Sequence, residues 1–337
     1  ELEVVKAGTV SGIRILSYAA LPDAALPSKS KVSGLSGAMF GLFFGVGMVF
    51  ARKLLIPRVD DPGWSERQLS LPNIVTLPYC KQQADRVEQH EITASGHLPL
   101  LAMDAPKDLT VEVLRSLRTS LQTTLISASN NLVGILGVAP NVGKTFVSAN
   151  LAHLLAVGGK RILLVDGDLR RGTLHKAFGL ASSPGLADVL GKDVALEQAL
   201  VTTSHPNLTI LPRGIYPKDP SELLTSEAFK QLVGLFSEQY DLVLFDTAPV
   251  LLVTDAVLIG VLCATNYLVV GAGVHSPKDL ELTSKRLENN KVHVTGSIFN
   301  FHSEEGQKNY YGYGYGYGYG YSAYYHDDEA VDDITHQ

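Results

Sequence analysis

The residues whose types and spacing most clearly indicate chemistry form the segment GVAPNVGKT, residues 137–145. It follows an apolar run and precedes a helical pattern, which is the context that a phosphate-binding P-loop requires. Glycine lets backbone N–H groups close around phosphate oxygens, and the N-terminus of the next helix adds its positive dipole end. We therefore predict that Lys144 reaches the β- and γ-phosphates of ATP and that Thr145 binds Mg²⁺. The residues predicted to bind the nucleotide are Gly137, Asn141, Val142, Gly143, Lys144, Thr145 and Phe146.

The first glycine of this loop departs from the common pattern GxxxxGK[ST], which would place a glycine at position 138. Position 138 is valine, and the glycine lies one residue earlier, at Gly137. The loop is therefore one residue longer or closes differently. A chance Gly-Lys-Thr after a strand is the alternative, but two acidic motifs support a phosphate site.

These acidic motifs place three carboxylates at the ends of apolar runs. ILLVDGD (residues 162–168) contains Asp166 and Asp168, and DLVLFD (residues 241–246) ends in Asp246. Residues i and i+2 of a strand share a face, and ligands of open α/β sheets bind at the carboxyl ends of the strands. One strand-terminal Asp is often only a turn or cap residue. Three of them beside a P-loop predict a Mg²⁺ site made by Asp166, Asp168, Asp246 and Thr145.

Apolar runs alternate with helical stretches from Leu109 onward, beginning with a helix over residues 110–123. Strands that alternate with helices imply a parallel sheet covered on both faces. Together with the P-loop, this pattern predicts an α/β fold of the P-loop NTPase type, with a mostly parallel sheet flanked by helices. The predicted strands are Leu132–Val138, Ile162–Val165, Leu208–Leu211, Leu242–Phe245, Tyr267–Val270 and Val294–Phe299.

A stretch of 20 residues from Val32 to Ala51 contains no charged side chain. About 20 apolar residues are what a helix needs to cross a bilayer. Arg52, Lys53 and Arg58 follow, and basic residues flank the cytoplasmic side of a span. A buried core helix is the alternative, although buried helices are rarely this long and uncharged.

These patterns divide the 337-residue chain into five predicted segments. In order, they are a periplasmic end segment (1–31), a transmembrane helix (32–51), a juxtamembrane linker (52–108), a P-loop domain (109–301) and a flexible tail (302–337). The chain shows no signal-peptide pattern, and we expect it to begin partway through a longer protein. The net charge of −6 gives no nucleic-acid signature, and the two cysteines lack metal-ligand spacing.

The predicted tail alternates tyrosine with glycine, as YYGYGYGYGYGYSAYY over residues 310–325. With almost no aliphatic residue it cannot bury a core, so we expect it to be mobile and able to reach the active site of a neighbouring subunit. A low-complexity tract that associates with itself is the alternative. The candidate phosphate acceptors are Tyr310, Tyr311, Tyr313, Tyr315, Tyr317, Tyr319, Tyr321, Tyr324 and Tyr325.

The motifs GVAPNVGKT, ILLVDGDLRRG and YDLVLFDTAPVL together resemble those of the bacterial tyrosine kinases (BY-kinases) of capsule and exopolysaccharide export. The resemblance extends from about residue 10 to the end and includes PKDPSELL (residues 217–224) and the tyrosine tail. It implies an ATP- and Mg²⁺-dependent autokinase that phosphorylates its tail between subunits and so regulates oligomerisation and polysaccharide export. The catalytic residues that it implies are Lys144, Asp166, Asp168, Arg170 and Asp246.

Glu112, Arg115 and Arg118 match the family's ExxRxxR helix, and the resemblance implies that they form the interface of a ring-like homo-oligomer. Their spacing puts the charges on one helical stripe, for which a solvated face is the alternative. The other partners implied are the membrane, a cognate protein-tyrosine phosphatase and the polysaccharide export machinery. The implied location is the bacterial inner membrane, with the kinase domain in the cytoplasm. Some members carry a regulatory tyrosine after the arginines of the second motif, but residues 172–175 read GTLH here.

Two other functions fit parts of the pattern. A ParA/MinD-type ATPase switch shares the fold and the phosphate chemistry, but its signature lysine would fall on Ala139. A non-catalytic polysaccharide co-polymerase subunit would use nucleotide only to gate assembly, and the intact Lys144 and acidic residues argue against an inactive site. Tail phosphorylation that requires Lys144 would separate a kinase from both.

Overall fold

The computed structural model describes residues 30–55, 57–80 and 100–302. The chain divides into two compact units, with the boundary between Ile56 and Pro57. The first contains helix α2 (Ser30–Leu55), and the second contains the other described elements. Residues 1–29 of the predicted end segment, and residues 303–337 with the candidate acceptor tyrosines, lie outside the described part of the chain.

Helix α2 presents apolar side chains over its described length. The side chains of residues 34–48 are exposed, and those of Phe40, Phe43 and Phe44 are 76–82% exposed. Within the described residues, none of the helices combines the length and the apolar character needed to cross a bilayer. The predicted span of residues 32–51 includes side chains outside the described part, so the transmembrane assignment stays a prediction.

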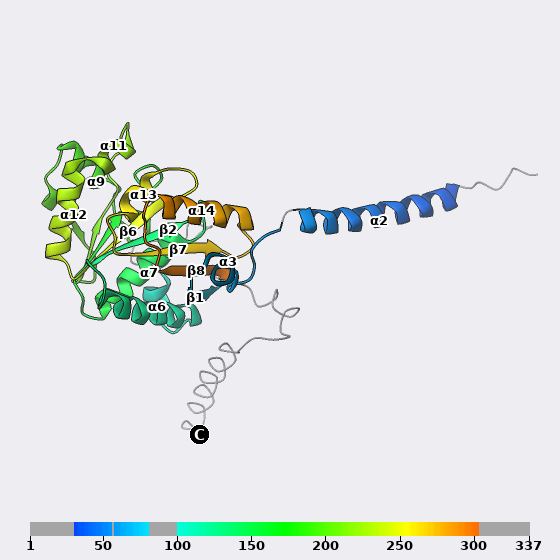
Figure 1. Ribbon diagram of the computed structural model, residues 1–337, viewed down its shortest axis with the longest axis horizontal. Coiled ribbons are helices and arrows are strands. Elements are labelled where there is room, and N and C mark those ends of the chain that lie inside the picture. The colour runs from blue at the N-terminus through cyan, green and yellow to red at the C-terminus, as the bar shows by residue number, and fades with distance from the viewer. Residues whose placement is uncertain (1–29, 56, 81–99, 303–337) are drawn as a thin grey trace, which may run out of the picture. The chain divides into compact units, whose positions relative to one another are not determined.

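The second unit is built on an eight-stranded sheet with the order β1-β8-β7-β2-β6-β3-β5-β4 (Figure 1). Every neighbouring pair is parallel except β4 and β5. This confirms the predicted mostly parallel α/β fold. The strands are β1 (Asn73–Pro78), β2 (Leu132–Gly137), β3 (Ile162–Asp166), β4 (Val201–Thr202), β5 (Leu208–Leu211), β6 (Leu242–Pro249), β7 (Thr265–Gly271) and β8 (Gly296–His302).

Helices cover both faces of this sheet, which explains why its central strands are continuous apolar runs. Along β3, Ile162 and Leu164 belong to one buried cluster, and Leu163 and Val165 belong to another on the opposite face. The helices of the second unit are α3 (Trp64–Leu69), α5 (Leu101–Asp104), α6 (Leu109–Leu125), α7 (Lys144–Val157), α8 (Leu174–Ala177), α9 (Leu186–Gly191), α10 (Leu196–Ala199), α11 (Pro220–Thr225), α12 (Glu227–Gln239), α13 (Asp255–Gly260) and α14 (Pro277–Asn289).

The structure differs from the sequence prediction at both edges of the sheet. All six predicted strands are present, but β1 and β4 were not predicted. Strand β1 lies inside the predicted linker 52–108 and pairs in parallel with β8, where Val75 is opposite Ile298. Much of that linker is therefore part of the folded unit. The strand was missed because it is short, ends in a proline and buries only Val75 and Leu77.

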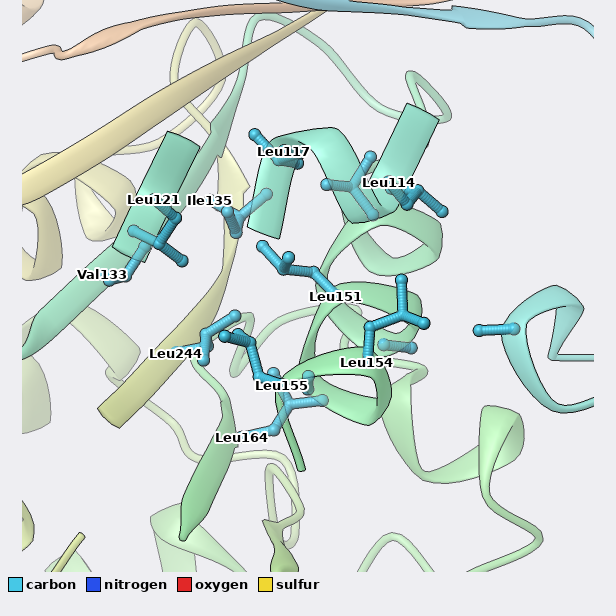
Figure 2. Packing of buried hydrophobic residues seen from close by; sticks show 14 of the residues in the cluster. Leu114, Leu117, Leu121, Val133, Ile135, Leu151, Leu154, Leu155, Leu164 and Leu244 are labelled. Atoms are coloured by element: carbon cyan, nitrogen blue, oxygen red, sulfur yellow. The ribbon is translucent and has the colours of Figure 1, made fainter. Parts of the chain in front are cut away.

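The main core lies between helices α6 and α7 and the sheet (Figure 2). Helix α6 is capped by Asp108, whose carboxylate accepts a hydrogen bond from the Thr110 amide, an N-cap arrangement. Its Leu114, Leu117 and Leu121 recur at helical spacing and are fully buried. This packing fixes α7, and with it the P-loop that leads into α7.

Replacing Leu117 by alanine should lower the free energy of unfolding by about 2–5 kcal/mol, because a fully buried leucine leaves a cavity. Gln122→Ala is the matched control, since Gln122 is an exposed residue of the same helix; its effect should stay within about 0.5 kcal/mol. Chemical denaturation followed by circular dichroism measures both. Equal losses in the two variants would contradict the packing described for α6.

Candidate nucleotide and phosphotransfer site

The P-loop connects β2 to α7 at the carboxyl edge of the sheet. Gly143 caps α7 with φ 93°, a left-handed conformation that favours glycine, and a Cβ there would collide with the Asn300 side chain. Asn300 Nδ2 donates to the Val142 carbonyl at 2.9 Å and so holds the loop from strand β8. At Gly137 a Cβ would lie 2.6 Å from Lys144 Cδ. The shifted first glycine is therefore the residue that lets the lysine side chain pass.

The Lys144 side chain folds back over this loop and is 8% exposed. Its Nζ donates to the Ala139 carbonyl at 3.4 Å. Burial lowers the pKa of Lys144, while the nearby Asp246 and Asp168 act to raise it. The ammonium group therefore lies between the P-loop backbone and the acids, where it can meet the phosphates of a bound nucleotide.

Asp246, in the carboxyl-terminal half of β6, receives hydrogen bonds from two hydroxyl groups of α7. Thr145 Oγ1 donates to Asp246 Oδ2 at 2.6 Å, and Ser148 Oγ donates to Asp246 Oδ1 at 3.2 Å. Burial raises the pKa of Asp246 to about 6, although Thr145, Lys144 and Ser148 each act to lower it. Ser148 was not predicted to belong to the site. The sequence signal that could have identified it is its position one helical turn after Lys144.

A second buried carboxylate, Asp166, lies directly beside Asp246, because the parallel register pairs these two residues across β3 and β6. Asp166 is fully buried, and its Oδ2 accepts a hydrogen bond from the Leu174 amide at 3.2 Å. Its Oδ1 is buried without a partner in the described part of the chain. Burial, and then the charges of Asp246 and Asp168, raise the pKa of Asp166 well above its usual value.

Asp168, which follows the end of β3, is the third acid and is more accessible than Asp166. Its side chain is half-buried, and its Oδ1 accepts hydrogen bonds from the backbone amides of Arg170 at 3.2 Å and Arg171 at 2.8 Å. This carboxylate therefore shapes the turn after β3. Its charge also acts on Lys144, Asp166 and Asp246, which places all three predicted acids in one cluster.

This cluster fits a Mg²⁺ ion bound together with a nucleotide. Among the described residues, no three His, Cys, Asp or Glu side chains are arranged to hold a metal ion by themselves. Mg²⁺ at nucleotide sites usually takes one or two carboxylates and completes its shell with phosphate oxygens and water. The orphaned Oδ1 of Asp166 and the Thr145–Asp246 pair supply oxygen ligands of that kind.

Comparisons with known proteins agree on one family. The family model described as AAA domain matches residues 131–277. The chain is 38% identical over 301 residues to the tyrosine-protein kinase ptk of Acinetobacter johnsonii, which is 89% of this chain and 41% of that protein. The kinase domain of Escherichia coli tyrosine kinase ETK is 33% identical with a TM-score of 0.66, over 74% of this chain and 97% of that structure.

A further solved structure, the BceF tyrosine kinase domain, is 40% identical with a TM-score of 0.68 and covers 73% of this chain and 99% of its own. The chain belongs to the family of bacterial tyrosine kinases. It spans about two fifths of the length of curated relatives such as ptk. In this chain the P-loop and the three acids gather at one edge of the sheet.

Two predicted nucleotide-binding residues, Val142 and Phe146, pack their side chains into or against the main core cluster. Val142 is fully buried, and Phe146 is half-buried and packs against the main core cluster. Asn141, by contrast, is exposed with φ 59°, at the turn of the loop. A P-loop needs backbone N–H groups at these positions, so the side chains of Val142 and Phe146 serve packing.

The Arg170 side chain bonds to Asp255 and Ser221 and so joins separate loops of the chain. Its Nε donates to Asp255 Oδ2 at 2.8 Å, and its Nη2 donates to Ser221 Oγ at 3.0 Å. Asp255, at the start of α13, is fully buried and also accepts a hydrogen bond from Ser221 at 2.8 Å. Neither Asp255 nor Ser221 was predicted. The structure therefore gives Arg170 a structural role, as the counterion of Asp255.

Substituting Arg170 by methionine should lower the free energy of unfolding by about 3 kcal/mol, because it leaves the buried Asp255 without its counterion. The double variant Arg170→Met/Asp255→Asn should recover most of that loss. Chemical denaturation of the two single variants and the double variant measures the coupling. Strictly additive losses would contradict a functional ion pair between these residues.

Asp246→Asn should stabilise the nucleotide-free chain at pH 8. The raised pKa means that the folded state favours the neutral form of the Asp246 carboxyl group. The stability that this neutral form contributes is complete below the unfolded pKa and is lost as the pH rises through about 6. The change from 3.8 to about 6 corresponds to about 3 kcal/mol. We expect the variant to exceed the parent by up to that amount at pH 8, with a far smaller difference at pH 4.

Asp241→Asn should change the stability at pH 8 in the opposite direction. Asp241 pairs with Arg161 at 2.8 Å, and this hydrogen bond lowers the pKa of Asp241. Its contribution is therefore present above the unfolded pKa and is lost as the pH falls. The asparagine variant should be less stable than the parent at pH 8. Thermal unfolding of both variants across pH measures these stability changes. A change in the same direction at pH 8 in both variants would contradict the pKa shifts assigned to Asp246 and Asp241.

Proposed function

We propose that this chain contains the cytoplasmic kinase domain of a membrane-anchored, ATP-dependent protein-tyrosine autokinase that phosphorylates tyrosines of its own C-terminal tail. The observation that carries the proposal is the cluster of Lys144, Thr145, Asp166, Asp168 and Asp246 beneath the P-loop. Family membership sets the reaction class, and the tyrosine-rich segment over residues 310–325 supplies acceptors.

The proposed reaction is an in-line transfer of the γ-phosphoryl group. The acceptor phenol oxygen forms a bond to the γ-phosphorus while the bond to the bridging oxygen of ADP breaks. Lys144 would neutralise charge on the β- and γ-phosphates. Thr145 and Asp246 would hold Mg²⁺, which supplies further charge neutralisation when bound. The leaving phenolic proton needs a carboxylate nearby, because a tyrosine phenol has a pKa of about 10 in water.

Asp168 is better placed than Asp166 to accept this proton. Asp166 is fully buried beneath the loop that follows β3, and Gly172 packs against its carboxylate. Asp168 is half-buried at the start of that loop and remains reachable from outside. We therefore assign Asp168 the role of base and Asp166 a role in ligand binding within the cluster.

We further propose that the tail is phosphorylated between subunits of a ring and that helix α6 forms part of the ring interface. On α6, Glu112 pairs with Arg115, whose Nη2 also donates to the Pro106 carbonyl at 2.9 Å. Arg118 Nη1 donates to the Leu154 carbonyl of α7 at 3.2 Å. All three side chains remain partly exposed, and a guanidinium group has five N–H donors, so both arginines keep donors for a neighbour.

The membrane assignment belongs to the same proposal. Residues 32–51 would cross the inner membrane, supported by the uncharged sequence and the exposed apolar side chains of α2. The basic residues that follow would lie on the cytoplasmic side. A cognate phosphatase and polysaccharide export machinery would be the partners of the full-length protein.

Mass spectrometry after incubation with Mg·ATP tests the proposed kinase activity. The parent chain should carry phosphate on tyrosines within residues 310–325, and Lys144→Met should carry none. The matched control is Lys160→Met, since Lys160 is an exposed lysine beyond the end of α7; its tail should be modified as in the parent. An unmodified parent tail with ATP hydrolysed would instead indicate a nucleotide switch of the ParA/MinD type.

A further inference from the structure

A surface rich in basic residues lies beside the three acids of the phosphotransfer site, on the loops that follow β3 and β5. These strands are parallel neighbours, so both loops leave the same edge of the sheet. The loop after β3 has no acidic residue over residues 170–178, and the loop after β5 has one over residues 212–219. Apart from Arg170, which pairs with Asp255, the cations of these two stretches are Arg171, Lys176, Arg213 and Lys218, and we call them the basic surface.

The charges of the basic surface are not neutralised within the described part of the chain. None of the four cations forms an ion pair with a carboxylate of a described residue. Arg171, Lys176 and Lys218 are exposed. Burial lowers the pKa of His175, and the charges of Arg213 and Lys176 lower it further, so these two cations from different loops lie near one another. The surface can therefore accept a partner of negative charge.

Arg213 gives this surface a charge held in a fixed position. Its side chain is 7% exposed, and its Nε and Nη1 have no hydrogen-bond partner among the described residues. The ring of Tyr216 covers the guanidinium group, with its centroid 3.8 Å from Cζ, and this ring is itself exposed. A cation–π contact stabilises a guanidinium group and leaves its charge in place. That charge acts through space, so a partner needs no contact with the buried nitrogen atoms.

Hydrogen bonds to helix α9 hold the loop that carries Arg213. The Leu186 amide donates to the Pro212 carbonyl at 2.7 Å, and Asp188 Oδ1 accepts from the Ile215 amide at 3.3 Å. Asp188 is itself buried. A preorganised surface loses little conformational entropy when a partner binds. The loop is therefore suited to hold a flexible acidic segment.

The C-terminal end of the chain has the complementary charge. Residues 327–333 contain five acidic residues and no Lys or Arg, and they begin two residues after Tyr325. An extended chain spans about 3.5 Å per residue, so acids that lie on the basic surface would keep Tyr324 and Tyr325 within about 10 Å of it. Asp168, the proposed base, is bonded to this surface, since it accepts a hydrogen bond from the Arg171 amide at 2.8 Å.

We propose that the basic surface docks the acidic segment 327–333 of a second copy of this chain and so brings the preceding tyrosines to the phosphotransfer site. This docking rests on the proposed autokinase function and adds to it the contact that selects the acceptor. Phosphorylation of the tyrosines nearest the acidic segment depends on the contact most. These are Tyr321, Tyr324 and Tyr325.

Steady-state transfer between two copies tests the docking. The donor is the chain truncated after His302, where β8 ends, and the acceptor is the Lys144→Met chain, with Mg·ATP present. Lys176→Glu/Lys218→Glu in the donor should raise the KM for the acceptor about 10-fold, because two attractions become repulsions. The KM for ATP should not change, since neither lysine belongs to the nucleotide site.

The matched control is a donor with Lys160→Glu/Lys285→Glu. Both lysines are exposed and lie outside the basic surface, and the change in net charge is the same. This control donor should keep the acceptor KM of the unaltered donor.

A charge swap separates docking from a general loss of activity. An acceptor with Asp327→Lys, Asp328→Lys and Asp332→Lys should be a poor substrate of the unaltered donor. The same acceptor should be a good substrate of the donor with Lys176→Glu/Lys218→Glu.

The proposal is overturned if this charge-reversed donor keeps the acceptor KM of the unaltered donor. It is also overturned if the lysine-bearing acceptor does not restore transfer by the charge-reversed donor. Either result, with transfer intact in the unaltered pair, would remove the docking and leave the proposed kinase activity standing. No transfer in the unaltered pair would overturn both.

Discussion

The hydrogen bonds from Thr145 and Ser148 to the buried Asp246 fix the start of helix α7 against strand β6, and the geometry of the site depends on them. The P-loop must close over this junction, since it joins β2 to the same helix. The sheet register then puts Asp166 beside Asp246. Burial raises the pKa of both carboxyl groups, and the nearby charge of Asp246 raises that of Asp166 further. Two carboxylates side by side in a buried place are electrostatically unfavourable until a cation joins them.

Contacts from outside the P-loop hold the loops around this junction. Asn300 on β8 holds the P-loop through the Val142 carbonyl, and the pair of Arg170 and Asp255 ties the turn after β3 to α13. Strands on both sides of β2 and β6 therefore restrain the site. A phosphotransfer site needs such support, because catalysis depends on positions held to within a fraction of an ångström.

The sequence predicted the parts of the site that are encoded by adjacent residues. The P-loop with Lys144 and Thr145, and the strands that carry Asp166 and Asp246, follow from short motifs and apolar runs. The partners of Arg170 could not be predicted, because Ser221 and Asp255 lie 51 and 85 residues further along the chain. Strand β1 was missed for a related reason: it is a strand only because β8, more than 200 residues later, pairs with it. Local pattern carries no information on such contacts.

Transfer of phosphate from one copy of the chain to the tail of another is the most direct test of the account. The Lys144→Met chain, which keeps its tail, is mixed with an otherwise unaltered chain truncated after His302, in the presence of Mg·ATP. We expect phosphotyrosine within residues 310–325 of the Lys144→Met chain, which can come only from the P-loop site of the truncated copy. An unmodified tail in this mixture would contradict it.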